Sequence, residues 1–323
     1  RRGLSPLSLI LAGLVISLLL GALNVMLMLL QPMGLSAMFI WSAGSLSQNN
    51  WDAVLFLLPR LGLALVLITL LVRPLSLLEL DDSGARSLGL SLDRLRVVAL
   101  ALAVFMTACV VSSVGVIGFI GLAAPTIARL MGARTLRQRL VWTPLLGAAL
   151  LLLTDQLVQG FAGRLSELLP TGGVTALLGA PLLLWLIPRL RLSTGRPQPS
   201  TQRTVSQPLG GHRLLPLMLL GLLLLAVVAL LLGQGPQGWN WSLNPELLQW
   251  RLPRLLAALG AGLLLGLAGC LLQRLTGNPM ASPELMGISA GAALGLMLTL
   301  FVWIGAPFWV RLIMGFAGAL LVL

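Results

Sequence analysis

The sequence contains no lysine and no tyrosine, one histidine and two cysteines. A P-loop needs a lysine for the nucleotide phosphates, so the absence of lysine excludes a Walker-type ATP site from these 323 residues. The single histidine, His212, lies in a polar stretch, and we therefore expect no histidine-based catalytic or metal site. Cys109 and Cys270 lie within apolar runs and are expected to be small core residues.

Charge is also scarce, because only 9% of the residues are charged and 58% are hydrophobic, with a mean hydropathy of +0.99. Several segments are apolar for about 20 residues, which is enough to cross the hydrocarbon core of a bilayer. We therefore predict an all-α, polytopic transmembrane helical bundle with about nine to ten spans. The net charge of +12 fits the cytoplasmic arginine excess of membrane proteins, and we expect no nucleic-acid partner.

The apolar runs are interrupted by one long polar segment. Residues 188–213 are rich in Pro, Ser, Thr, Gln and Gly and contain five arginines, which is typical of a linker. Further on, Ser282, Pro283 and Glu284 have the pattern of a helix N-terminus and predict a span that ends near Trp303. The last apolar run continues to Leu323, so we expect these residues to be part of a longer protein.

The distribution of arginine predicts the orientation in the membrane. The short helix expected at residues 117–131, which Gly118, Gly121 and Pro125 interrupt, is counted as a crossing. All but five of the 21 arginines then lie in the cytoplasm, as membrane proteins prefer; the five are Arg60, Arg164, Arg251, Arg254 and Arg311. The charged loop DDSGARSLGLSLDRLR, residues 81–96, and the linker are then both cytoplasmic.

Two of these charged features allow more than one interpretation. The loop at residues 81–96 is either an ordinary solvated loop or a docking segment, in which Gly89 permits a sharp turn and Ala85 gives a smooth face. Arg251 and Arg254 lie three residues apart, on one face of a helix. They either reach lipid headgroups or present a paired positive patch to an acidic partner.

Three stretches resemble one family of membrane proteins. They are RLPRLLAALGAGLLLGLAGCLLQRLTGNPMASPELMGISAGAALG at residues 251–295, GVIGFIGLAAPTIARLMGA at residues 115–133 and GGVTALLGAPLLLWLIPR at residues 172–189. They resemble FecCD-type permease subunits of ABC importers for iron siderophores and vitamin B12. The end-type motifs precede the start-type motif, which resembles two permease units fused in tandem. Residues 1–190 would be the C-terminal part of the first unit, 191–213 a cytoplasmic linker and 214–323 the N-terminal part of the second.

The resemblance implies a permease that moves ferric hydroxamate siderophores across the bacterial inner membrane. A separate, dimeric ABC ATPase would supply energy and hold ATP and Mg²⁺, so no cofactor is expected in this chain, which would not be an enzyme. A periplasmic siderophore-binding protein would deliver the cargo. The alternatives are a permease for vitamin B12 or haem, and a secondary, ion-coupled transporter.

The resemblance also implies roles for individual residues, with no catalytic or metal-binding residue among them. ATPase coupling would involve Asp81, Asp82, Ala85, Arg86, Gly89 and Asp93. Binding-protein docking would involve Arg251, Arg254 and Arg164, and the translocation path would be lined by Ser17, Asn24, Gln273, Asn278 and Ser289. Gly266 and Gly269 fit either the path or helix packing. Asp155, the acid at the end of an apolar run, is expected to be a partnered structural residue rather than a proton carrier.

Overall fold

The structure is a computed structural model that describes residues 6–30, 42–48, 50–77, 91–162, 170–186, 211–235, 238–241, 245–303 and 305–322. These residues form ten helices and one short hairpin. The helices are α1 (Pro6–Leu30), α3 (Asp52–Leu77), α5 (Leu92–Val114), α6 (Ile120–Leu130), α7 (Leu136–Ala162), α8 (Thr171–Leu186), α9 (Gly211–Leu231), α10 (Pro245–Thr276), α11 (Ile288–Val302) and α12 (Phe308–Leu321). The prediction of a helical bundle is therefore confirmed for the described ranges, and the hairpin is the one addition to it.

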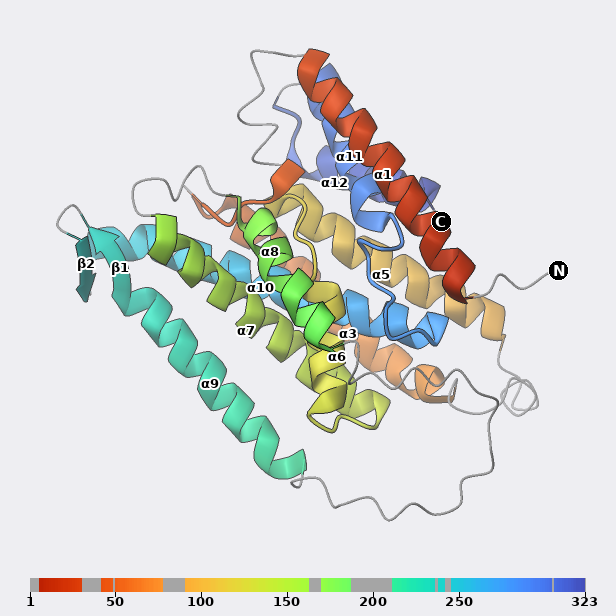
Figure 1. Cartoon of the computed structure of the whole chain (residues 1–323), viewed down its shortest axis with the longest axis horizontal. Helices are drawn as coiled ribbons and strands as arrows, with labels where there is room; N and C mark the ends of the chain where they lie inside the picture. Colours follow the sequence, from red (N-terminus) through yellow and green to blue (C-terminus); the bar gives the residue numbers. More distant parts are fainter. Residues whose placement is uncertain are drawn as a thin grey trace.

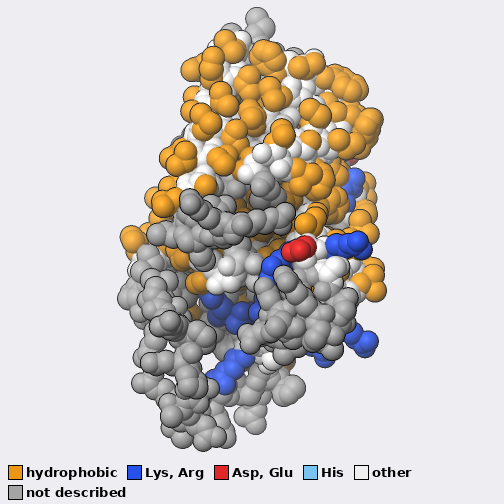
Figure 2. All heavy atoms as spheres, turned by 90° about the vertical axis from the view of Figure 1, so that its right-hand side faces the viewer, with side chains coloured by type: hydrophobic (Ala, Val, Ile, Leu, Met, Phe, Trp, Pro, Cys, Tyr) orange, Lys and Arg blue, Asp and Glu red, His pale blue; other side chains and the backbone are white. Residues whose placement is uncertain are grey.

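Six of these helices are long and apolar enough to cross a membrane, namely α1, α3, α5, α7, α9 and α10. The other four, α6, α8, α11 and α12, are apolar but shorter. The outer faces of the long helices carry many exposed hydrophobic side chains, such as Leu18 and Leu29 on α1 and Leu223 and Leu224 on α9. Hydrophobic side chains cover the upper part of the face in Figure 2, with arginines gathered below. Such a surface suits contact with lipid.

Helix α10 lies in the middle of the bundle and α9 runs along its edge (Figure 1). In α10, 83% of the apolar window is buried, against 6% in α9. Helix α10 packs on α3, α5, α6 and α7, all of which precede the predicted linker. The segments on the two sides of residues 191–213 thus pack into one bundle.

Small residues allow α10 to lie this close to its neighbours. A Cβ added to Gly262 would come within 2.6 Å of Cα of Ala148 on α7, and one added to Gly269 would collide with the carbonyl oxygen of Gly121 on α6. Gly266 similarly lies against Pro144. Of the two interpretations open for Gly266 and Gly269, the structure therefore supports helix packing.

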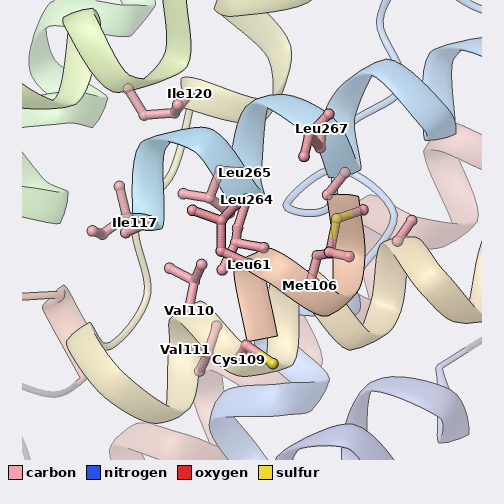
Figure 3. Packing of buried hydrophobic residues seen from close by; sticks show 14 of the residues in the cluster. Leu61, Met106, Cys109, Val110, Val111, Ile117, Ile120, Leu264, Leu265 and Leu267 are labelled. Atoms are coloured by element: carbon pink, nitrogen blue, oxygen red, sulfur yellow. The ribbon is translucent and has the colours of Figure 1, made fainter. Parts of the chain in front are cut away.

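Leucines of α10 fill the centre of the core. Figure 3 shows Leu264, Leu265 and Leu267 of α10 among residues of α3 and α5, including Leu61 and Met106. Cys109 and Cys270 are both free and buried, as expected of small core residues. The core thus surrounds α10, and displacing that helix would disrupt most of it.

Two local features differ from the sequence prediction. Residues 232–241 contain an antiparallel pair of strands, β1 (Leu232–Gly235) and β2 (Gly238–Trp241), in which Leu232 pairs with Trp241. Helix α11 begins at Ile288, so the prediction of a helix start at Ser282 was wrong. The Ser282 hydroxyl accepts a local hydrogen bond from the N–H of Leu285. Gly287 precedes the helix with φ +78°, a conformation that glycine adopts at no steric cost.

Candidate functional site

The paired arginines at the start of α10 have partners inside the molecule. Arg254 donates from Nε to both carboxylate oxygens of Asp155 on α7, at 2.9 Å each, and from Nη2 to Oδ1 at 2.7 Å. Gln159 donates a further hydrogen bond to Asp155 Oδ2 at 2.8 Å. Asp155 is buried, and the Arg254 side chain is 17% exposed. The prediction that Asp155 has a partner is confirmed, and its structural role stays a prediction.

Arg251 fastens α10 to the end of α9. Its Nη1 donates to the carbonyl oxygens of Leu230 and Leu231, at 2.8 and 3.2 Å. A cation at this end of a helix satisfies terminal carbonyls and faces the negative end of the helix dipole. A cavity with room for about one water molecule lies beside both arginines and is lined by Leu152, Asp155, Gln156, Gln159, Ala229 and Leu255. Docking of a binding protein on Arg251 and Arg254 stays a prediction.

The five residues predicted to line the path are distributed over two regions. Ser17 of α1 donates to the carbonyl oxygen of Glu284 at 3.0 Å, and Ser289 is buried at the start of α11. Asn24 is buried further along α1. Gln273 instead faces α6, where its amide donates to the carbonyl oxygen of Leu122 at 3.5 Å. The side-chain oxygen of Asn278 accepts a hydrogen bond from the N–H of Met280 in a turn. Lining of a path by these residues stays a prediction.

Most of the residues predicted to couple to an ATPase lie outside the described ranges. These are Asp81, Asp82, Ala85, Arg86 and Gly89, and the docking candidate Arg164 lies outside them too. Asp93 is described, and it is exposed in the first turn of α5. A carboxylate in that position interacts favourably with the positive end of the helix dipole, so Asp93 has a local role whether or not it also docks.

Sequence patterns did not single out Glu284 as a buried acid. Both of its carboxylate oxygens are buried and accept no hydrogen bond within the described residues, although the rest of the residue is half-buried. It lies in the segment between α10 and α11, close to Gly118 of the first half of the chain. Burial raises the pKa of Glu284 above its ordinary value, and nearby donors, the Ser282 hydroxyl and its own backbone N–H, only partly oppose this.

Glu284→Gln is expected to stabilise the protein at neutral and higher pH. Folding raises the pKa of this carboxyl, so its contribution to the free energy of unfolding is fully present at a pH below its pKa in the unfolded protein. That contribution is lost as the pH rises toward its pKa in the folded protein. The neutral amide avoids this loss and the cost of a buried unpaired charge, a gain of about 1–3 kcal/mol. Melting temperatures of the detergent-solubilised protein should differ at pH 8 and converge near pH 4.5. An equal difference at both pH values would show that ionisation of Glu284 is not the cause.

The sequence is similar to known membrane proteins along nearly all of its length. The model of the FecCD transport family matches residues 1–189 and 214–323. The iron(3+)-hydroxamate import system permease protein FhuB of Salmonella typhimurium is 48% identical over 98% of this chain and 46% of the relative. FhuB of Escherichia coli is 47% identical over 98% of this chain and 48% of the relative.

Other relatives match a shorter part of the chain. The Fe(3+) dicitrate transport system permease protein FecC of Escherichia coli is 39% identical over 56% of this chain and 54% of the relative. No solved structure matches the chain. The chain spans about half the length of the FhuB relatives.

Proposed function

Because the chain belongs to the FecCD transport family, we propose that it forms part of the permease of an ABC importer for ferric hydroxamate siderophores. The observation that carries this proposal is the identity of 47–48% across 98% of the chain with two iron(3+)-hydroxamate permeases. The dicitrate permease shares 39% identity over only 56% of the chain, which favours the hydroxamate class of cargo.

The proposal extends to a tandem arrangement of two permease units. Residues 1–190 belong to the first unit, residues 214–323 to the second, and residues 191–213 are the linker. The two segments that match the family model flank residues 190–213, which supports this division. The permease lies in the inner membrane of a bacterium, and its linker is in the cytoplasm.

Energy comes from a separate dimeric ATPase that binds ATP and Mg²⁺. The segment at residues 81–96 docks on the ATPase, and a loaded periplasmic binding protein docks on the opposite side of the membrane. Closure of the ATPase dimer then moves the helices and passes the siderophore inward. This scheme needs no ion-carrying acid in the membrane, and the ion pair with Arg254 favours a structural role for Asp155.

Gly89→Arg tests the coupling step. In a strain that lacks the gene for the protein, wild-type copies should restore uptake of iron-55 ferrichrome, whereas Gly89→Arg should restore at least about tenfold less, because a large cation prevents close docking. The ATPase should also fail to copurify with the variant. If wild-type copies restored uptake of iron-55 dicitrate but not of ferrichrome, the proposed cargo would be wrong.

The matched control is Ser91→Ala. Ser91 lies in the same segment, but its side chain makes no capping hydrogen bond to α5. Loss of its hydroxyl adds neither bulk nor charge, so uptake and copurification should both be retained. If Gly89→Arg retained both ATPase binding and uptake, the coupling role of residues 81–96 would be wrong, while the transport function would stand.

A further inference from the structure

Phe119 has a backbone conformation that is unusual for a residue with a side chain. Its φ is +69° and its ψ is −27°, and no other non-glycine residue in the described ranges has a positive φ. This region is unfavourable for a bulky residue, because Cβ comes too close to the backbone carbonyl. The carbonyl oxygen of Phe119 accepts the hydrogen bonds from Leu122 and Ala123 that begin α6. A change of φ at Phe119 would therefore change the direction of α6.

Backbone groups from two other segments hold the chain just before Phe119. The carbonyl oxygen of Val116 lies against both Gly44 and Gly172, and a Cβ added to either glycine would collide with it. The N–H of Gly172 donates to the carbonyl oxygen of Gly44 at 3.2 Å, which ties these two segments together. The chain is thus fixed as far as Val116, and a change of direction between α5 and α6 has to occur after it.

The side chain of Phe119 packs against Gly179 of α8, which lies beside α6 (Figure 1). Gly179 is buried, and a Cβ added to it would collide with the ring and come within 2.6 Å of Cβ of Phe119. A residue stays in a strained backbone conformation only where its surroundings hold it there, and the contact with Gly179 does this for Phe119. Two opposing effects therefore set its position. Backbone strain favours release of the ring, and packing against Gly179 favours its retention.

Helix α6 can turn at Phe119 while its closest contact with α10 persists. That contact joins Gly121 to Gly269, and Gly121 is only two residues beyond Phe119. Helix α6 has 11 residues and is therefore about 16 Å long, so a rotation at Phe119 moves its far end, at Leu130, much further than Gly121. Protein hinges are typically a few residues at the ends of elements that absorb large changes in φ and ψ, and residues 117–119 have this position.

We propose that residues 117–119 are a hinge on which α6 turns relative to α5, and that the contact of the Phe119 ring with Gly179 is the latch that holds α6 in the observed position. When the ring leaves Gly179, Phe119 adopts an ordinary negative φ and the far end of α6 changes direction. Alternating access needs elements with two positions, and α6 is one of them. The hinge goes beyond the proposed function and does not rest on it, because a distance within the chain tests it.

The test measures the distance between two nitroxide labels in the full chain in detergent by double electron–electron resonance. The labels are attached through Val97→Cys on α5 and Leu130→Cys at the end of α6, both at exposed positions, with the buried Cys109 and Cys270 replaced by alanine. An unaltered hinge should give one predominant distance. Gly179→Ala expels the ring, so a second distance should appear and the share of the original one should fall at least about threefold.

Two substitutions of Phe119 separate backbone strain from the loss of packing. Phe119→Ala removes the ring but keeps the Cβ that makes a positive φ unfavourable, so the second distance should predominate. Phe119→Gly also removes the ring, but glycine adopts this φ at no steric cost, so the original distance should be retained far better. The double variant Phe119→Gly with Gly179→Ala should also keep the original distance, because it has neither strain nor a collision.

The matched control is Gly173→Ala, which adds the same methyl group to α8. Its Cβ meets only the side chain of Pro170, at 3.4 Å, so the original distance should be unchanged. The latch would be wrong if Phe119→Ala kept the single original distance, or if Gly173→Ala changed it as much as Gly179→Ala. Equal shares of the two distances in Phe119→Ala and Phe119→Gly would overturn the role of strain, and this comparison holds even where Gly179→Ala does not fold.

Discussion

Asp155→Asn is expected to lower the free energy of unfolding by about 3–5 kcal/mol, because removing one partner of a buried ion pair leaves the other charge uncompensated. Arg254 would keep its positive charge between α7 and α10 with an amide in place of the carboxylate. The melting temperature of the detergent-solubilised protein should fall by at least about 5 °C. Arg254→Gln should have a similar effect, since it leaves the Asp155 carboxylate buried and 1% exposed.

A double variant separates the ion pair from simple packing. Asp155→Leu with Arg254→Met replaces both charges by apolar side chains of similar size, and such replacements of buried ion pairs are often neutral. The double variant should therefore be more stable than either Asp155→Asn or Arg254→Gln alone. Strictly additive losses in stability would contradict the view that the two side chains act as a pair.

The same variants distinguish the two roles open to Arg254. If its main role is the internal ion pair, Arg254→Gln lowers the melting temperature, and the apolar double variant restores both stability and uptake. If Arg254 instead receives a binding protein, the double variant is stable but binds the siderophore-loaded binding protein more weakly, as measured by surface plasmon resonance. Arg251→Gln provides the comparison at the neighbouring position, where the guanidinium bonds to backbone carbonyls.

Gly269→Ala is expected to be the most damaging single-methyl addition in α10. Its new Cβ would collide with the backbone carbonyl of Gly121, which cannot rotate away as a side chain can. Helices α6 and α10 would have to separate, and overpacking of this kind costs about 1–3 kcal/mol, or more where backbone must move. Yield of folded protein and melting temperature should both fall.

Gly260→Ala is the matched control on the same helix. A Cβ at that position meets the side chain of Leu57 at 3.7 Å, which is ordinary van der Waals contact. Alanine also favours a helix over glycine by about 1 kcal/mol, so this variant should be neutral or slightly stabilising. If the two variants behaved alike, the close contact between Gly269 and Gly121 would not be what holds α6 against α10.

Composition and apolar run length predicted the fold class, because a helix that crosses lipid must satisfy its backbone internally and must be long and apolar. They could not predict which helical faces meet. Gly269 and Gly260 both lie among apolar residues of the same helix, so the sequence does not distinguish them. Gly269 does not tolerate a side chain because the backbone of α6 lies against it, whereas Gly260 meets only a side chain of α3. The partner of Asp155 is 99 residues away in sequence, on a helix beyond the predicted linker.

Local signals were weakest where the chain turns. Ser282, Pro283 and Glu284 have the composition of a helix N-terminus, but Gly287 sets the actual start of α11. A capping pattern specifies hydrogen bonds that can form, and it does not specify whether neighbouring helices leave room for them. The buried carboxylate of Glu284 was missed for the same reason, since its burial comes from packing against segments far away in sequence.

The central position of α10 has a consequence for biosynthesis. Helices α5, α6 and α7 are made before α10, and the ribosome must add roughly 110 more residues before α10 is complete, which takes about 5–20 s at about 5–20 residues per second. During that interval the surfaces of α6 and α7 that later contact Gly262 and Gly269 have not yet met α10. Leaving these surfaces without α10 costs little free energy, because lipid tails solvate small apolar surfaces. Another small-faced helix could nevertheless occupy them first, so slower translation should increase misassembly.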